Sequence, residues 1–372
     1  MNITVVGAGN MGLVVAAYLA KKGKDYVTIY TSKKISSAIE LIDEENGTID
    51  IVDNFKVTSS SQEAFKKNSI VLCTYPAFLR NKFINENKKD LLNVHSIVFI
   101  PGYGGAEYFC KELMNAGVKI VGLQRVPYVA RSGYKEGKLI AHMISKKNRL
   151  FVATIPKVEN ETSRIIVEEI FDIETKALKE YLAVTLAPSN PLLHLVGVYN
   201  LYHNYKSGIH YDRVLGFYEE WNDDASDMLL KYDDELQEIC KKMKCFELDE
   251  VVPLSVYYES DTKEKMTRKL KSIEAFKCVK APMKHEKDGF VPDFSSRMFT
   301  EDFPYGICIF KAFAIMNDVK TPIMDKLLEF YYEMTGKLYF DKNDKLTEMA
   351  KNTGIPYVYG IKNMNQLIEL YK

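Results

Sequence analysis

The stretch that decides the fold is NITVVGAGNMG, residues 2–12. Its first five residues favour a short strand, and a helix-like apolar pattern follows from Met11 to Ala20, closed by Gly23. The G-x-G-x-x-G turn between them permits a tight turn, a close approach of pyrophosphate to the backbone and close packing of helix on strand. We therefore predict a dinucleotide-binding turn formed by Gly7, Ala8, Gly9, Asn10, Met11 and Gly12. A glycine turn that serves only packing is the alternative reading.

Further strand-like runs alternate with helical segments over the next 150 residues, which predicts a mostly parallel sheet. We place these runs at 26–30, 69–73, 97–100, 118–121 and 139–143, with 150–155 and 165–170 as further candidates. Near residue 185 the pattern changes to long helical segments, notably 192–205 and 224–244, and 281–296 is expected to be a loop. The predicted fold class is an α/β N-terminal Rossmann domain with a mostly parallel sheet, residues 1–185, followed by an all-α C-terminal domain, residues 186–372.

The composition excludes several classes of partner. The chain has 50 Lys+Arg and 50 Asp+Glu, so no basic excess attracts nucleic acid or an anionic membrane. We find no apolar run of the roughly 18 residues that a membrane span needs, and no signal peptide. The six cysteines are scattered without metal-ligand spacing. We therefore expect a cytoplasmic chain without a metal, a nucleic-acid partner or a membrane partner.

The end of the second predicted strand bears on the choice of cofactor. NAD-specific sites usually carry a carboxylate there, whereas this chain has Thr31, Ser32 and Lys33. Hydroxyl and ammonium groups suit a 2′-phosphate, so we predict NADP(H) as the preferred cofactor and leave NAD(H) open. The alternative is that Lys33 and Lys34 are solvated surface residues that begin the next helix. Tyr75, which follows the third strand, is also expected to reach the cofactor, because ligands bind beyond the carboxyl ends of such strands.

A second group of candidate residues lies in the C-terminal half. His194 is early on a predicted buried helix, after a cap at Ser189 or Asn190, and Asp302 follows a predicted N-cap at Thr300. A histidine that moves protons, a carboxylate that orients it and an arginine that grips a substrate carboxylate would suit carbonyl reduction, and Arg297 completes that set. Each residue also has a structural interpretation: a satisfied core histidine, a helix-capping aspartate and a surface ion pair.

The motifs GAGNMG, NPLLH and SRMFTEDFPYG (residues 7–12, 190–194 and 296–306) together resemble the octopine/nopaline, or opine, dehydrogenase family. The resemblance implies NAD(P)H-dependent reductive condensation of a pyruvate-like α-keto acid with the amino group of an amino acid or related amine. It also implies that His194 is the catalytic histidine, Asp302 its carboxylate partner and Arg297 the keto-acid anchor. The expected partners are thus small molecules, and a homodimer is compatible with the sequence.

Two other functions remain open at this stage. A dehydrogenase of the ketopantoate reductase or glycerol-phosphate type would use a lysine on a buried helix, and we find no comparable lysine in the sequence. A non-catalytic dinucleotide sensor would not need His194, Arg297 and Asp302 to converge. The sequence does not identify the keto acid or the amine, and it does not show whether the product is a metallophore.

Overall fold

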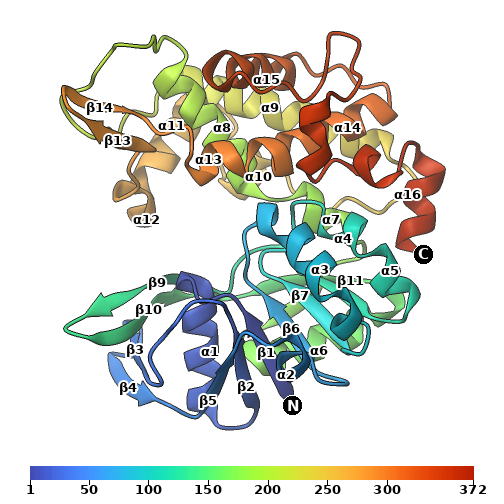
Figure 1. Ribbon diagram of the computed structural model, residues 1–372. Helices are drawn as coiled ribbons and strands as arrows, with labels where there is room; N and C mark the ends of the chain where they lie inside the picture. The colour runs from blue at the N-terminus through green and yellow to red at the C-terminus, as the bar shows by residue number, and fades with distance from the viewer. The chain divides into compact units, whose positions relative to one another are not determined.

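The computed structural model describes residues 1–372, which divide into two compact units (Figure 1). The first unit is Met1–Thr185 together with Ile368–Lys372, and the second is Leu186–Leu367. Each unit has its own architecture, α/β in the first and mainly helical in the second.

The first unit is built on an eight-stranded sheet in the order β12-β11-β8-β7-β6-β1-β2-β5. All neighbouring strands pair parallel except β8 and β11, which confirms the mostly parallel sheet of a Rossmann domain. The central β6 and β7 are buried at every residue, as expected for parallel strands covered on both faces. The strands are β1 (Asn2–Val6), β2 (Tyr26–Tyr30), β5 (Phe55–Thr58), β6 (Ile70–Cys73), β7 (Ser96–Phe99), β8 (Lys119–Leu123), β11 (Leu150–Ile155) and β12 (Thr175–Ala177).

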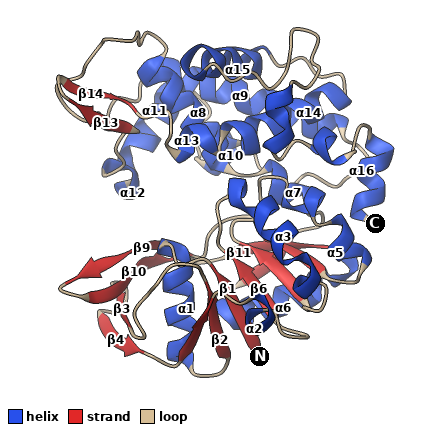
Figure 2. Ribbon diagram, in the orientation of Figure 1, coloured by secondary structure: helices blue, strands red, loops and turns tan.

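A second sheet in the same unit has the order β4-β3-β10-β9, and the sequence did not predict it. Its strands are β3 (Ile39–Asp43), β4 (Thr48–Val52), β9 (Tyr128–Lys135) and β10 (Lys138–Lys146). The helix α1 (Asn10–Lys22) contacts strands of both sheets and lies between them (Figure 2). The run at 139–143 therefore belongs to this second sheet, and the connection from β2 to β5 contains two strands where an ordinary crossover would place a helix.

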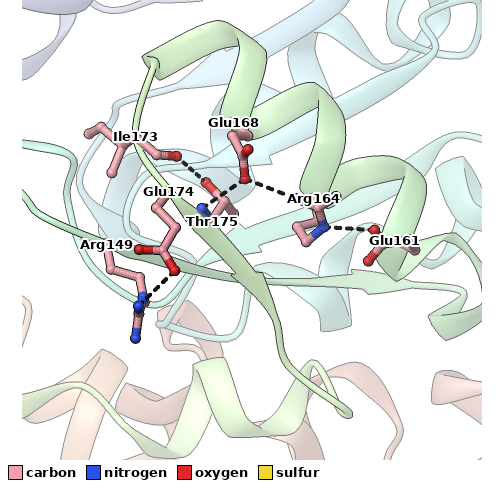
Figure 3. A network of polar contacts seen from close by, with 7 residues as sticks. All are labelled: Arg149, Glu161, Arg164, Glu168, Ile173, Glu174 and Thr175. Atoms are coloured by element: carbon pink, nitrogen blue, oxygen red, sulfur yellow. Dashed lines mark hydrogen bonds and ion pairs between the residues drawn. The ribbon is translucent and has the colours of Figure 1, made fainter.

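The run at 165–170 is helical, so its assignment as a candidate strand was wrong. It lies in α6 (Asn160–Phe171), whose buried residues Ser163, Val167, Ile170 and Phe171 follow helical spacing. Figure 3 shows how this helix is fastened to β12: Arg164 pairs with Glu161 and Glu168, and Glu168 accepts the backbone N–H of Thr175. The remaining helices of this unit are α2 (Ser61–Ala64), α3 (Ala77–Leu91), α4 (Ala106–Phe109), α5 (Lys111–Asn115), a 3₁₀ turn at Lys157–Glu159 and α7 (Leu182–Leu186), which reaches the unit boundary.

The second unit is mainly helical, as predicted. Its principal helices are α8 (Ser189–Tyr202), α9 (Asp223–Lys242), α11 (Lys263–Ser272), α14 (Cys308–Met316) and α15 (Pro322–Thr335). Shorter elements are α10 (Leu254–Tyr257), α12 (Glu274–Lys277), α13 (Arg297–Thr300), a π-helix at Phe303–Ile307, and 3₁₀ turns at Glu348–Asn352 and Pro356–Tyr359.

The segment 281–296 is not simply a loop, because it folds into the hairpin β13 (Met283–Glu286) and β14 (Gly289–Pro292). Its two strands pair antiparallel, and Gly289 at φ +136° begins the return strand. The all-α prediction for this half of the chain therefore needs this one exception.

The final helix, α16 (Met364–Tyr371), ends in residues that group with the first unit. There the Tyr371 hydroxyl donates to the buried Glu107 carboxylate at 3.0 Å, and the Thr185 hydroxyl donates to the same oxygen at 2.5 Å. Burial raises the pKa of Glu107.

One stretch, Leu182–Tyr202, is long and apolar enough to cross a membrane by length and composition. The expectation that no run reaches this length was therefore too strict. In the protein 72% of its most apolar part is buried, as in a core helix, so this stretch is only weak evidence of a membrane span.

Candidate active site

The glycine turn of residues 7–12 has the geometry of a phosphate cradle. Gly7 has φ +104°, which only glycine adopts readily, and a Cβ on Gly12 would lie 2.0 Å from the Gly7 carbonyl oxygen. A Cβ on Gly9, by contrast, would meet no atom within 4 Å, so this position borders open space. The helix α1 has no side-chain cap and no acidic residue in its first turn. Its first N–H groups and its dipole therefore suit an anion such as a pyrophosphate.

The side chains within this turn have structural roles that the motif did not reveal. Asn10 Oδ1 accepts hydrogen bonds from both the backbone N–H and the hydroxyl of Ser132, each at 2.9 Å. Ala8 and Met11 are partly buried against the core of the unit. The turn is thus tied to β9 of the second sheet.

The end of β2 carries no carboxylate, but its threonine is engaged within the chain. Thr31 is buried, and its hydroxyl oxygen accepts the Lys33 backbone N–H at 3.1 Å, which shapes a tight turn. Ser32 and Lys33 are exposed. No helix begins at Lys33; the chain runs on to β3.

Tyr75 lies beside the glycine turn. A Cβ on Gly7 would come within 3.1 Å of its ring, and the ring meets Phe83 edge-on at 5.7 Å. The fully buried Arg80 holds the neighbouring backbone, because its Nε donates to the Tyr75 carbonyl at 2.9 Å and its Nη1 to the Tyr103 carbonyl at 2.6 Å. Sequence reasoning missed Arg80, since an arginine on an ordinary helix gives no signal that it will be buried.

In the second unit His194 and Asp302 meet. His194 Nδ1 lies 2.8 Å from Asp302 Oδ2, and the side chains are 21% and 5% exposed. Because the carboxylate engages Nδ1, Nε2 is the ring atom left for exchanging a proton with a bound molecule. The imidazole ring also packs edge-on against Phe217 at 5.8 Å.

Close backbone approaches bring these two residues together. A Cβ on Gly306 would lie 2.6 Å from Pro191, so the π-helix that follows Asp302 packs directly on the first turn of α8. Short π-helical segments often occur at functional sites, where they aim side chains that a regular helix would point elsewhere. All five residues of this π-helix are buried, so the position of Asp302 is fixed by packing.

The helix caps predicted around these residues were wrong in detail. Thr300 ends α13 and its hydroxyl donates back to the Ser296 carbonyl at 3.0 Å, while Asp302 itself takes the N-cap position of the next helical segment. Likewise Pro188, and neither Ser189 nor Asn190, takes the N-cap position of α8.

Burial and the neighbouring basic side chains act in opposite directions on the pKa of Asp302. Burial raises its pKa and nearby Glu301 adds to that effect, while His194 and Arg297 act in the opposite direction, with a net rise. Burial therefore opposes the charged form of the Asp302 carboxyl group, and the contact with His194 favours it.

Arg297 lies four residues before Glu301 and is paired with it. Its Nε and Nη2 both lie 2.5 Å from Glu301 Oε2, and its side chain is 65% exposed whereas that of Glu301 is 3% exposed. Arg297 thus pairs with Glu301, the residue that directly precedes Asp302 in the chain.

One buried lysine does lie on a helix, contrary to our reading of the sequence. Lys311 on α14 is buried, but Asp325 at 2.6 Å and Asp344 at 3.4 Å neutralise it. Its ion pairs mark it as a structural residue. No group of three or more His, Cys, Asp and Glu side chains is arranged to hold a metal ion.

Two family models match this chain, one in its C-terminal half and one in its N-terminal half. Residues 177–335 match the model of the NAD/NADP octopine/nopaline dehydrogenase α-helical domain, and residues 2–111 match that of the NAD-dependent glycerol-3-phosphate dehydrogenase N-terminus. The octopine dehydrogenase of Mizuhopecten yessoensis is 22% identical over 99% of this chain and 98% of its own length.

Solved structures share the fold. An octopine dehydrogenase with NADH and L-arginine has a TM-score of 0.84 at 20% identity, covering 99% of this chain and 97% of its own. A yersinopine dehydrogenase with bound NADP⁺ has a TM-score of 0.70 at 12% identity, covering 99% of both chains. The motifs, the two matched regions and the shared fold agree, and the chain therefore belongs to the octopine/nopaline, or opine, dehydrogenase family.

Proposed function

We propose that this chain catalyses the NAD(P)H-dependent reductive condensation of an α-keto acid, such as pyruvate, with the amino group of an amino acid or related amine. The observation that carries the proposal is the 2.8 Å contact between His194 Nδ1 and Asp302 Oδ2, which leaves Nε2 for proton transfer. A dinucleotide sensor has no need of such a pair. The octopine dehydrogenase structure with NADH and L-arginine supports an amino acid as one substrate class.

The proposed roles of the residues follow from the chemistry. The amine attacks the keto carbon and water leaves, so a proton must be removed from the amine and given to the departing hydroxyl. His194 Nε2 would carry out both transfers, and Asp302 would hold the imidazole tautomer and stabilise its charged form. Arg297 would bind the keto-acid carboxylate and so position the carbonyl. When bound, the nicotinamide cofactor supplies the hydride that reduces the imine.

The proposed cofactor site lies within residues 1–185, and the proposed catalytic residues lie within 186–372. The glycine turn with open space at Gly9 fits a pyrophosphate, and Tyr75 lies against that turn. NADPH is the cofactor we propose to be preferred, because Ser32 and Lys33 are exposed at the end of β2, where a carboxylate would select NADH. A cytoplasmic location and a homodimer complete the proposal; size-exclusion chromatography tests the homodimer.

The test is a screen of NADPH and NADH oxidation with pyruvate and other α-keto acids, each crossed with amino acids and polyamines. Activity that requires keto acid and amine together is expected. His194→Ala should lower kcat by about 10²- to 10⁴-fold, the usual worth of general acid–base catalysis, with the cofactor KM unchanged. Near-wild-type turnover of folded His194→Ala would leave His194 as a core histidine only.

A further inference from the structure

Glu301 is a buried carboxylate beside an exposed arginine, and nothing in the proposed reaction uses it. Its side chain is 3% exposed, whereas that of its partner Arg297 is 65% exposed. In an ordinary surface ion pair both side chains are solvated and the pair has little effect on stability. Here the carboxylate has left water while the guanidinium has not, so the pair is more than a surface contact.

The contact fixes how the guanidinium is presented. A guanidinium offers two edges of paired donors, the Nε–Nη2 edge and the Nη1–Nη2 edge. Glu301 Oε2 accepts from both Nε and Nη2 at 2.5 Å, so it occupies the first of these edges. This contact therefore fixes the orientation of the guanidinium plane.

The backbone strengthens this arrangement. Arg297 begins α13 and its carbonyl accepts the Glu301 N–H at 2.9 Å, so the two side chains leave the same helical turn. Glu301 is followed directly by Asp302 and the buried π-helix, which are held by packing. The long arginine side chain is thus tied to the buried part of the site.

We propose that Glu301 is the positioning residue that fixes Arg297 for binding the keto-acid carboxylate. This inference rests on the proposed function, since it concerns the substrate-binding step of that reaction. Glu301 acts through Arg297 and touches no reacting atom, so it is not a catalytic residue. Without it, Arg297 must be immobilised each time that the substrate binds, which weakens binding.

Glu301 also contributes a negative charge next to the acid–base pair. The charged and titratable groups that act on Asp302 are His194 from α8, together with Arg297 and Glu301 from its own segment. The buried hydroxyls of Tyr232 on α9 and of Tyr218 also sense the Asp302 charge. Removing the Glu301 charge favours the ionised form of Asp302.

Two variants separate the effect of the Glu301 side-chain length from the effect of its charge. Glu301→Gln keeps the length of the side chain and removes the charge, and Glu301→Asp keeps the charge and shortens the reach. Both should raise KM for the keto acid about three- to tenfold, the penalty for immobilising one flexible side chain, with little change in kcat. Only Glu301→Gln should also move the acid limb of the kcat/KM profile to lower pH, by about half a unit to one unit.

A double-mutant cycle with Arg297→Ala tests whether Glu301 acts through Arg297. The rise in KM caused by Glu301→Gln should disappear in the Arg297→Ala background. Glu161→Gln, which removes a partner of Arg164 in the first unit, serves as the matched control and should leave KM unchanged. Circular dichroism confirms that each variant is folded.

A fall in KM for Glu301→Gln would show that Glu301 weakens the anchor by neutralising it, and would overturn the proposal. The same would follow from an equal KM effect with and without Arg297. If the wild-type enzyme shows no oxidation that requires keto acid and amine together, the proposed function itself fails. If the wild type is active and the Glu301 variants match it, only this inference fails.

Discussion

Replacing Asp302 by asparagine should abolish most of the activity without unfolding the protein. Asparagine has the shape of aspartate, so it fits the same buried position beside His194 Nδ1, now 2.8 Å from the carboxylate. The amide can either accept from Nδ1–H or donate to Nδ1, so the imidazole tautomer is no longer fixed. In either orientation of the amide, the protonated imidazole no longer has an anionic neighbour. We expect kcat to fall by about 10²- to 10⁴-fold.

The effect on stability should be small because two contributions oppose each other. Losing a hydrogen bond to a charged group costs about 1.5–3 kcal/mol. Burying a carboxylate costs several kcal/mol in its own right, and the raised pKa of Asp302 shows that burial outweighs its partners. We therefore expect the free energy of unfolding at pH 7 to stay within about 1 kcal/mol of wild type, or to rise.

The sign of the pH dependence follows from the same shift. An acid whose pKa is higher in the folded state has no effect on stability at pH values below both pKa values, and lowers stability as pH rises through them. Asp302→Asn should remove this loss, so the unfolding free energy should decline less between acidic and neutral pH. Urea denaturation across that range and kcat at saturating substrates are the assays. Near-wild-type turnover, or a loss of stability above about 3 kcal/mol, would refute the reasoning.

Four further substitutions test other parts of the molecule. Gly9→Val should raise the cofactor KM at least about tenfold with an unchanged melting temperature, because its side chain enters the open space proposed for the pyrophosphate. Gly12→Ala is the contrasting variant. Its Cβ would lie 2.0 Å from the Gly7 carbonyl oxygen, so it should lower the free energy of unfolding by about 1–3 kcal/mol. Lys33→Ala should raise KM for NADPH and leave KM for NADH unchanged in steady-state kinetics, and an equal change in both would place the lysine away from the 2′-phosphate. Tyr371→Phe should lower the urea-measured unfolding free energy by about 1 kcal/mol through loss of the bond to Glu107, with kcat unchanged, and a stable variant would show that this bond is dispensable.

The elements that the sequence predicted correctly are those with local signals. The α1 helix begins within the glycine turn and ends before Gly23, which is in the left-handed conformation, as expected from neighbouring residues alone. The second sheet escaped prediction because β3 pairs with β10, about a hundred residues later, and no local pattern reports such a pairing. In α6, the β-branched run Ile165, Ile166 and Val167 suggested a strand, but packing of the helical stripe that includes Val167 and Phe171 overrode that propensity.

The candidate site shows the same division. The motifs pointed to His194 and Asp302 as a pair, and the structure brings them into contact although 108 residues separate them. What the sequence could not show is which neighbour each side chain uses: that Glu301 occupies one edge of Arg297, that Asn10 binds Ser132, or that Arg80 is buried. These contacts depend on the burial and orientation of the surrounding backbone, which residue types and spacing do not encode.

The return of the last five residues to the first unit matters for anyone who wishes to divide the protein. Cleaving the chain once, after Thr185, would give an N-terminal fragment that retains Glu107 but lacks Tyr371. A dinucleotide-binding fragment would need the terminal peptide supplied in trans or fused through a short linker.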